Sequence, residues 1–348
     1  MQTVVTHSSD PVSLSLSDLG WSEFFDDQLA ADEAGLAPMR VATVHRSRLT
    51  AESQGGSARL TLAANVKTTD FAVGDWVLVE PDTHMLVRRL DRQALLQRRT
   101  EGGRPRQLIA ANVDTLFVVT SCNDDFNPAR LERYLALANE AGTNPVIVLT
   151  KVDQVADAAP FVEQAAALQA GLDVVMVNAT ASEAARVLAP WCGAGQTVAL
   201  VGSSGVGKST LLNTLSSKGP EDAQPTGAIR EGDAKGRHTT TARSLHTIAG
   251  GGLVIDTPGM RTLHVSNVSV GIDMVFAEIA DLAPECRFGN CTHDHEPGCA
   301  IHAAIAAGTL DPARVARWRK LLEENEANTP VPSGPRGNKI LKTRGKKR

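Results

Sequence analysis

The nine residues GSSGVGKST, from Gly202 to Thr210, have the spacing G-x-x-x-x-G-K-[ST] of a loop that binds nucleotide phosphates. The apolar run QTVALV precedes them and STLLNTLSS follows, so we expect a strand, the loop and a helix in that order. Glycines let backbone N–H groups curl around phosphate oxygens, and the amino end of the helix adds a positive dipole end. We expect Lys208 to reach the β- and γ-phosphates and Ser209 to ligate Mg²⁺. The loop leaves ATP and GTP open, and its predicted ligand-binding residues are Gly202, Ser203, Ser204, Gly205, Val206, Gly207, Lys208, Ser209 and Thr210.

The stretch GGLVIDTPGM, residues 251–260, could act at the γ-phosphate. It places Asp256 at the end of an apolar strand, where a carboxylate can hold the Mg²⁺ shell. The backbone N–H of Gly259 can meet the γ-phosphate and sense its loss. In many GTPases a glutamine that orients the attacking water follows this glycine. Here the residue is Met260, and a thioether cannot perform that task.

The polar segment GRHTTTAR, residues 236–243, has what a first switch loop needs, a hydroxyl for Mg²⁺ and a backbone N–H for the γ-phosphate. We select Thr240 for this role, and Thr239 and Thr241 remain alternatives. His238 is the nearby side chain able to orient or deprotonate water near neutral pH, although it could instead be a solvated loop histidine. The residues predicted to act in catalysis are His238, Lys208 and Thr240, and the predicted Mg²⁺ ligands are Ser209, Thr240 and Asp256.

The stretch LTKVDQ, residues 149–154, could recognise a guanine base, although Asp153 precedes Gly202 by 49 residues. Asp153 would accept hydrogen bonds from the ring N–H and the exocyclic amine, and the alkyl stem of Lys151 would lie along the base plane. The commonest form of this motif begins with asparagine, so at Thr150 one hydroxyl replaces an amide that both donates and accepts. K-x-D is a weak signal by itself. It gains weight here from its place at a strand end, and the segment predicted to bind the base is Thr150, Lys151, Val152 and Asp153.

The stretch VNAT, residues 177–180, follows the next predicted strand. Asn178 and Ala179 lie in a short loop that could present a backbone N–H to the guanine O6. The five GTPase elements then occur in a fixed order along the chain: two segments that bind the base, LTKVDQ and VNAT, then the phosphate loop, the first switch and the second switch. Because the termini of compact domains often lie close together, a circular permutation can produce this order on an unchanged sheet.

The elements that must position these residues alternate between strands and helices from about residue 108. VDTLFVVTS, PVIVLT, DVVMV and QTVALV are apolar runs typical of buried strands, and the segments between them have helical periodicity. Such alternation predicts a largely parallel sheet with helices on both faces. Ligands bind at the carboxyl ends of such strands, where LTKVD, VNAT and VGSSG are all found.

The regions on either side of this α/β segment have different patterns. Residues 40–98 alternate with period two between Gly and Pro turns, which predicts a small antiparallel barrel of the OB type. Such a barrel can bind single-stranded nucleic acid, but stacking aromatics are sparse here, so a spacer role remains open. Residues 1 to about 38 are acidic and polar, and we expect them to be loosely attached. Residues 271–325 are predicted to be helical apart from a cysteine cluster.

The cluster CRFGNCTHDHEPGC, residues 286–299, predicts a metal site. Three thiolates and one imidazole saturate a tetrahedral Zn²⁺ ion, and a closed site of this kind is structural. Free cysteines seldom lie so close together in a chain. The thiolates would come from Cys286, Cys291 and Cys299, and the imidazole from either His293 or His295.

The bulk properties exclude several classes of protein. With 348 residues and 42% hydrophobic content, the chain can form more than one core. Five cysteines do not suggest a secreted disulfide framework, and no apolar run approaches the roughly 18 residues of a membrane span. We therefore expect a cytoplasmic protein that does not bind membranes. The segment from Glu326 onward contains seven basic residues and one acidic residue, so its net charge is +6, and that of the rest of the chain is −10. Such a tail could bind polyanions, or it could be a solvated terminus without a function.

These motifs together resemble the circularly permuted, ribosome small-subunit-dependent GTPases, the ribosome biogenesis GTPase A family, over roughly residues 40–325. TKVD, GSSGVGKST, GRHTTT, DTPGM and the Cys-x4-Cys-x-His-x5-Cys cluster occur in that order after a barrel. The resemblance favours His293 over His295 as the zinc ligand, and Met260 and His238 also fit the family. It implies GTP hydrolysis with Mg²⁺, one structural Zn²⁺ ion, and contacts to the small ribosomal subunit and its ribosomal RNA.

The resulting interpretation is a multidomain, monomeric GTPase that hydrolyses GTP to GDP as a late checkpoint in assembly of the small subunit, with turnover stimulated by that subunit. Two alternatives remain: a nucleotide-gated RNA-binding module in which hydrolysis is incidental, and a permuted GTPase with another ribosomal or signalling partner. The expected parts are an acidic extension at 1–39, an OB-fold RNA-binding barrel at 40–100, a circularly permuted α/β GTPase domain at 101–265, a mostly helical zinc-binding domain at 266–325 and a basic disordered tail at 326–348.

Overall fold

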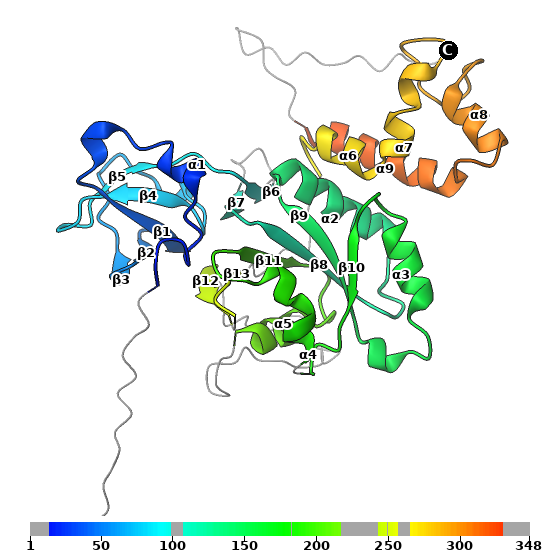
Figure 1. Ribbon diagram of the computed structural model, residues 1–348. Helices are drawn as coiled ribbons and strands as arrows, with labels where there is room; N and C mark the ends of the chain where they lie inside the picture. Colours follow the sequence, from blue (N-terminus) through cyan, green and yellow to red (C-terminus); the bar gives the residue numbers. More distant parts are fainter. Residues whose placement is uncertain are drawn as a thin grey trace, which may run out of the picture. The chain divides into compact units, whose positions relative to one another are not determined.

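The computed structural model describes residues 14–98, 107–181, 183–216, 243–248, 250–256 and 265–329. The chain divides into two compact units, Met1–Leu263 and His264–Arg348, which are described separately (Figure 1). Within the described ranges, no helix is both long enough and apolar enough to cross a membrane.

The first unit begins with antiparallel strands around a small core of their own. Strand β1 pairs with β2 through its second half and with β4 through its first half, and its register shifts between Val41 and Thr43. One long strand thereby pairs with two neighbours, and all these pairings are antiparallel, as the period-two pattern of residues 40–98 predicts. The strands are β1 (Ala37–Val44), β2 (Leu49–Ser53), β3 (Gly56–Arg59), β4 (Trp76–Val79) and β5 (Leu86–Arg89), with a 3₁₀ turn, η2 (Thr68–Asp70), before β4. Their core contains Met39, Val41, Leu49, Ala51, Leu60, Phe71, Val77, Val79 and Leu86.

The expectation that the N-terminal extension is loosely attached is wrong for its described part, residues 14–36. Leu19 and Phe25 are completely buried. The ring of Trp21 packs edge-on against Trp76 of β4 with centroids 4.8 Å apart. The expectation was wrong because acidic residues dominate the composition of this segment. Its few apolar side chains nevertheless bury enough surface to hold it in place. The segment contains α1 (Glu23–Asp26) and η1 (Ala31–Glu33).

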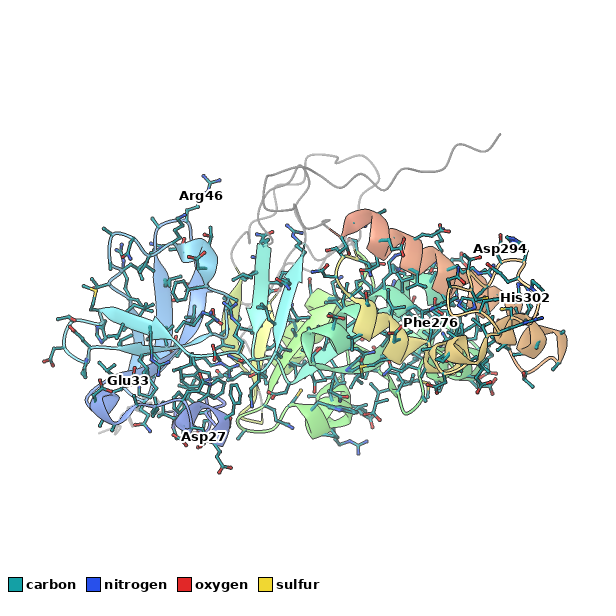
Figure 2. All side chains as sticks on the ribbon, turned by 90° about the horizontal axis from the view of Figure 1, so that it is seen from above. Asp27, Glu33, Arg46, Phe276, Asp294 and His302 are labelled. Atoms are coloured by element: carbon teal, nitrogen blue, oxygen red, sulfur yellow. The ribbon has the colours of Figure 1, made fainter. Side chains whose placement is uncertain are left out.

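An ion pair fixes the end of the extension to strand β5. The Glu33 carboxylate accepts hydrogen bonds from Nε and Nη2 of Arg88, at 2.5 and 2.7 Å, beside the strands (Figure 2). Arg88 Nη2 also donates to the carbonyl of Gln28 at 2.7 Å. The hydrogen bond from Arg88 lowers the pKa of Glu33 to about 2, with a smaller contribution from the Ala30 N–H. Two-pronged contacts of this kind hold a side chain in one orientation.

The central sheet has the strand order β10-β9-β8-β11-β13-β12, and β12 is antiparallel to β13 whereas the others are parallel. A separate hairpin, β6 (Leu95–Arg98) and β7 (Gln107–Ala111), precedes it. Apolar runs form β8 and β11, in which every residue is buried, as expected for strands covered on both faces. The strands are β8 (Thr115–Ser121), β9 (Asn144–Thr150), β10 (Asp173–Met176), β11 (Thr197–Val201), β12 (Ser244–Thr247) and β13 (Leu253–Asp256).

Helices cover both faces of this sheet. Buried residues of α4 and α5 join one core cluster with side chains of β8, β9, β11 and β13. Helices α2 and α3 lie against β8, β9 and β10 instead (Figure 1). Strands β9 and β10 lie on one side of β8, and the next strand in the chain, β11, lies on its other side. In open α/β sheets the ligand binds where the strand order changes side in this way, here at the carboxyl end of β11. The helices are α2 (Pro128–Ala141), α3 (Ala159–Ala166), α4 (Glu183–Leu188), followed by η4 (Ala189–Trp191), and α5 (Lys208–Leu215).

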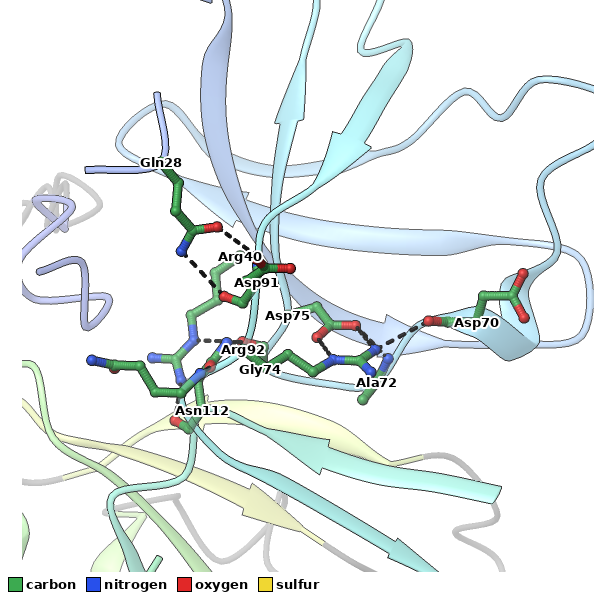
Figure 3. Close-up of polar contacts among 10 residues, drawn as sticks. Gln28, Arg40, Asp70, Ala72, Gly74, Asp75, Asp91, Arg92 and Asn112 are labelled. Carbon is green, nitrogen blue, oxygen red and sulfur yellow. Dashed lines mark hydrogen bonds and ion pairs between the residues drawn. The ribbon is translucent and has the colours of Figure 1, made fainter. Parts of the chain in front are cut away.

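Strands β1–β5 meet the central sheet at β1 and β12, where Thr43 pairs with Ser244. Near this pair Arg40, which is 1% exposed, donates to the backbone carbonyls of Leu19, Gly74 and Asn112, and Figure 3 labels the last two beside Arg40. The Nη2–Asn112 O distance is 2.9 Å, and Asn112 Nδ2 donates to the Gly74 carbonyl at 2.9 Å. Burial lowers the pKa of Arg40 to about 10, while the carboxylates of Asp114 and Asp75 act in the opposite direction.

Gly74 and Asp75 contribute further contacts to the region where β1 meets β12. Gly74 has φ +92°, and a Cβ at this position would lie 2.2 Å from the carbonyl oxygen of Ala111, so the turn requires glycine. The fully buried carboxylate of Asp75 accepts two hydrogen bonds from Arg92, at 2.6 and 2.8 Å, and one from the Ala72 N–H at 2.7 Å. Hydrogen bonds of Arg40 and Asn112 thus hold together the extension, the strands β1–β5 and the segment between β7 and β8.

The second unit is helical. Pro312 begins its longest helix, and the Asp311 side chain caps that helix by accepting from the Ala313 N–H at 2.9 Å. Arg314 pairs with Glu278 at 2.6 Å and lies over the Phe276 ring at 4.4 Å. These contacts fasten α9 to α7 around an apolar core. The helices are α6 (Ser269–Val275), α7 (Ala277–Ala280), η5 (Ala283–Glu285), α8 (Ala300–Ala306) and α9 (Pro312–Asn328).

Candidate functional site

The loop between β11 and α5 has the backbone of a phosphate cradle. Gly202, Gly205 and Gly207 have φ values of 141°, 82° and 96°, which L side chains rarely adopt. A Cβ on Gly202 would lie 2.1 Å from the carbonyl oxygen of Val119 on β8. The glycines predicted from the motif are therefore required by the backbone itself. Each turns the chain so that successive N–H groups can point toward one ligand.

Lys208 and Ser209 begin helix α5 at the mouth of this loop. The Lys208 ammonium folds back and donates to the carbonyl of Gly202 at 2.8 Å and to that of Ser203. Ser209 is exposed in the first turn. The last residue of β13, Asp256, is half-buried, one position beyond the paired Ile255 and Ala199. A hydroxyl and a carboxylate at one sheet edge are oxygen donors of the type that Mg²⁺ prefers.

The base-reading segment begins where β9 ends. Lys151 has φ 56° and ψ 30°, a left-handed turn, and Asp153 follows in a 3₁₀ turn, η3 (Val152–Gln154), with its side chain exposed. Because β9 and β11 flank β8 and run parallel, their carboxyl ends open at the same edge. Residues 49 positions apart in the sequence are thus brought to one edge of the sheet.

Thr150 differs from its predicted neighbours. It is completely buried, and its Oγ1 lies 2.7 Å from the carbonyl oxygen of Val206 in the phosphate loop and 3.1 Å from that of Thr120. Its hydroxyl therefore connects the segment predicted to bind the base with the phosphate loop. The sequence suggested a weaker substitute for asparagine at this position and gave no sign of the tether.

The stretch VNAT forms a tight turn after β10. Val177 is buried and donates its N–H to the Leu149 carbonyl at 2.9 Å. Asn178 Oδ1 accepts from the N–H and the hydroxyl of Thr180, at 3.1 and 2.7 Å. Ala179 lies beside the phosphate loop, since a Cβ on Gly207 would be 3.7 Å from both Ala179 Cβ and Thr150 Oγ1. All three predicted segments of the nucleotide site therefore meet around Gly207.

The switch residues lie outside the described ranges. These are His238 and Thr240, with its alternatives Thr239 and Thr241, in the first switch, and Gly259 and Met260 in the second. The described strands between the two switch segments are β12 and β13, which pair with each other, and β12 also pairs with β1.

The cysteine cluster of the second unit brings four donor atoms together. The sulfur atoms of Cys286 and Cys299 are 3.9 Å apart, and His293 Nδ1 lies 3.4 and 3.6 Å from them. With Cys291, all four atoms lie within 4.8 Å of one another. Bond lengths of about 2.3 Å to sulfur and 2.0 Å to nitrogen give edges of roughly 3.5 to 3.8 Å in a tetrahedron, close to the three distances among Cys286, His293 and Cys299. His293, and not the exposed His295, belongs to the group, which could hold a metal ion.

Glu296 orders the loop between Cys291 and Cys299. Its carboxylate accepts from the N–H groups of Thr292, Asp294 and His295, at 2.9, 3.1 and 3.2 Å, and from the Thr292 hydroxyl at 2.5 Å. The hydrogen bonds from Thr292 lower the pKa of this carboxyl well below its usual value. The residue spacing indicated the three cysteines and left His293 and His295 open as the fourth donor, and it gave no sign of this supporting carboxylate.

The sheet order and the phosphate loop define a circularly permuted P-loop GTPase domain, because the segments predicted to bind the base precede the phosphate loop in the chain but open at the same edge of the sheet. A family model described as RsgA GTPase matches residues 89–266. The chain belongs to the RsgA GTPase family and is a GTPase.

Its relatives cover most of the chain. A protein of Mesorhizobium japonicum named small ribosomal subunit biogenesis GTPase RsgA is 67% identical over 97% of both chains. A Vibrio vulnificus protein named small ribosomal subunit biogenesis GTPase RsgA 2 is 48% identical over 92% of this chain and 90% of that one. The crystal structure of YjeQ from Thermotoga maritima matches with a TM-score of 0.61 and 25% identity, over 83% of this chain and 98% of that one. YloQ, described as a circularly permuted GTPase, matches in fold with a TM-score of 0.58 and 22% identity, over 87% and 100%.

Proposed function

We propose that this GTPase binds the small ribosomal subunit and hydrolyses GTP to GDP as a late-stage checkpoint of subunit assembly, with turnover stimulated by the subunit. The observation that carries the proposal is the 67% identity, over 97% of both chains, to a relative named for small-subunit biogenesis. The residues of the site also support stimulation of GTP hydrolysis by the subunit. Met260 stands where many GTPases have a water-orienting glutamine, so efficient hydrolysis calls for help from another group.

In this proposal the nucleotide spans the edge formed by β9, β10 and β11. The N–H groups of the phosphate loop bind the phosphate oxygens, and the Lys208 ammonium exchanges its bonds to loop carbonyls for bonds to the β- and γ-phosphates. Asp153 accepts from the guanine ring N–H and amine, while the Ala179 N–H faces O6. Ser209, Thr240 and Asp256 would hold Mg²⁺, which neutralises charge on the β- and γ-phosphates. His238 orients the attacking water, and the Gly259 N–H contacts the γ-phosphate.

The metal of the second unit is, in this proposal, one structural Zn²⁺ ion. Three thiolates with one imidazole form a donor set that favours zinc, and four protein ligands leave no position for a reacting water. Arg319 and Trp318, on α9, lie close to His293, so binding of the ion would fasten the cysteine loop to the longest helix. The zinc-binding domain at 266–325 would thus depend on its metal for folding.

The strands β1–β5 would form an OB-type barrel that contacts ribosomal RNA. Arg46 projects from the β1–β2 turn into solvent, and Arg48 of the same turn is also exposed (Figure 2). The Arg46 carbonyl accepts from Thr68 at 3.0 Å, which brings the turn that contains Lys67 to the same end of the barrel. Clustered cations of this kind bind phosphates, so RNA affinity should fall with salt. The basic tail at 326–348, nearly all of it outside the described ranges, would add to this affinity.

The test is GTP turnover with purified small subunits, with large subunits and without either. The proposal expects stimulation by the small subunit alone, and equal rates in all three mixtures would overturn it. Lys208→Ala should abolish nucleotide binding, whereas His238→Ala should keep GTP affinity, lose turnover and remain trapped on the subunit. Sedimentation of the same samples should show a monomer in the absence of subunits, as proposed for a cytoplasmic assembly factor.

A further inference from the structure

The turn at Asn178–Ala181 has its two central peptide groups fixed by hydrogen bonds. The Asn178 carbonyl accepts from the Ala181 N–H at 3.0 Å, which orients the peptide that contains the Ala179 N–H. In the next peptide, the Thr180 N–H donates to Asn178 Oδ1 at 3.1 Å. The carbonyl of that peptide belongs to Ala179, and its partner comes from outside the turn.

That partner is the Thr214 hydroxyl on α5, which donates to the Ala179 carbonyl at 2.9 Å. The same hydroxyl lies 3.1 Å from the Thr210 carbonyl one helical turn earlier, a contact that restrains its rotamer. Helix α5 begins with Lys208 and Ser209, so the helix that starts at the phosphate loop also holds the base-side turn.

We propose that Thr214 is a positioning residue for guanine recognition, which aims the Ala179 N–H at the O6 oxygen of the base. Within the part of the chain that the structure describes, this N–H donates to no protein acceptor, so it is available to a ligand carbonyl. Guanine presents an oxygen at C6, whereas adenine presents an amine that cannot accept in the same way. Loss of the Thr214 hydroxyl frees one face of the turn and lets the Ala179 N–H leave its direction. The inference rests on the proposed guanine site and adds a residue outside the recognised motifs.

The experiment compares dissociation constants for three nucleotides by calorimetry. 6-Thio-GTP keeps the ring N–H and the amine that Asp153 would read but replaces O6 by a poorly accepting sulfur. Inosine triphosphate keeps O6 and lacks the amine. The unmodified protein should prefer GTP to 6-thio-GTP by about three- to tenfold, the value of one hydrogen bond. In Thr214→Val this ratio should fall toward one, while the ratio of GTP to inosine triphosphate stays unchanged.

Two variants separate positioning from folding. Thr214→Ser keeps the hydroxyl and should keep the thio-discrimination. Ser216→Ala removes a hydroxyl from the end of the same helix that has no hydrogen-bond partner among the described residues, and it should leave all affinities unchanged. If Thr214→Val does not fold, Thr214→Ala replaces it with a stronger helix former.

The proposal is overturned if the hydroxyl-free variants bind all three nucleotides more weakly by one common factor, or if they discriminate as well as the unmodified protein. Absence of thio-discrimination in the unmodified protein would also overturn it, because the N–H would then not face O6. Failure of the guanine site itself has a different signature, namely equal affinity of the unmodified protein for GTP and ATP.

Discussion

Removal of the Thr150 hydroxyl tests how the segment predicted to bind the base is held against the phosphate loop. Thr150→Val keeps the shape of the side chain and removes the donor to the Val206 carbonyl, a contact of 2.7 Å at a completely buried position. Loss of one such bond costs about 0.5–1.5 kcal/mol, and leaving a buried carbonyl short of a partner can raise the cost to roughly 3 kcal/mol. We therefore expect the free energy of unfolding of the GTPase domain to fall by about 1–2 kcal/mol.

GTP affinity should fall as well. Without the tether, the nucleotide must order the segment that begins at Lys151 against the phosphate loop. Fixing the backbone of one residue costs about 1 kcal/mol, which corresponds to roughly a fivefold rise in the dissociation constant. Urea unfolding followed by fluorescence measures the first effect, and titration calorimetry with GTP measures the second.

The chain contains a matched control for this substitution. Thr120, on the adjacent strand β8, is 2% exposed, and its hydroxyl has no hydrogen-bond partner among the described residues. Thr120→Val makes the same chemical change and should be neutral or slightly stabilising, because an unpaired buried hydroxyl is costly. Thr150→Ser should behave like the unmodified protein. Equal stability and equal GTP affinity of Thr150→Val and Thr120→Val would refute the tether.

Three further predictions concern the rest of the chain. Arg40→Met removes the donor to the Leu19 and Asn112 carbonyls and one of the two donors to the Gly74 carbonyl, and it should destabilise the first unit by about 3 kcal/mol in urea unfolding, whereas the exposed-site control Arg48→Met should have little effect. The Glu33 pKa is depressed from 4.5 to about 2, so its pairing with Arg88 stabilises the fold above pH 4.5 and is lost as the pH falls toward 2. The melting temperatures of the unmodified protein and Glu33→Gln should therefore differ at pH 6 and converge as the pH falls from 4.5 toward 2, and a constant difference would count against the ion pair. Removal of metal with a chelator should reduce the helical circular dichroism of the second unit while GTP affinity stays unchanged, and intact helicity after verified metal loss would contradict a structural role.

Local patterns predicted the parts of the site that depend on neighbouring residues. The phosphate loop was predictable because its glycines, lysine and hydroxyl act within nine consecutive positions, and the structure gives these glycines the required positive φ. The cysteine cluster was predictable for the same reason. The choice of His293 over His295 came from the family pattern, since spacing left both open.

Contacts between distant segments could not be predicted in the same way. The Thr150 and Thr214 tethers join residues 56 and 35 positions apart, and no periodicity or motif marks either hydroxyl. The pairing of β1 with β12 joins two sheets whose strands each have an ordinary pattern. The extension was misjudged because acidic residues dominate its composition, although Leu19, Trp21 and Phe25 carry the apolar surface that anchors it.

The central claim is that Asp153 reads the base of the nucleotide whose phosphates lie over Lys208. It is tested most directly by the affinities of Asp153→Asn for GTP and xanthosine triphosphate. Xanthine carries an oxygen in place of the guanine amine, so the asparagine amide can donate where the aspartate accepted. The account predicts that the variant binds xanthosine triphosphate more tightly than GTP, the reverse of the unmodified protein. An unchanged preference for GTP in Asp153→Asn would contradict it.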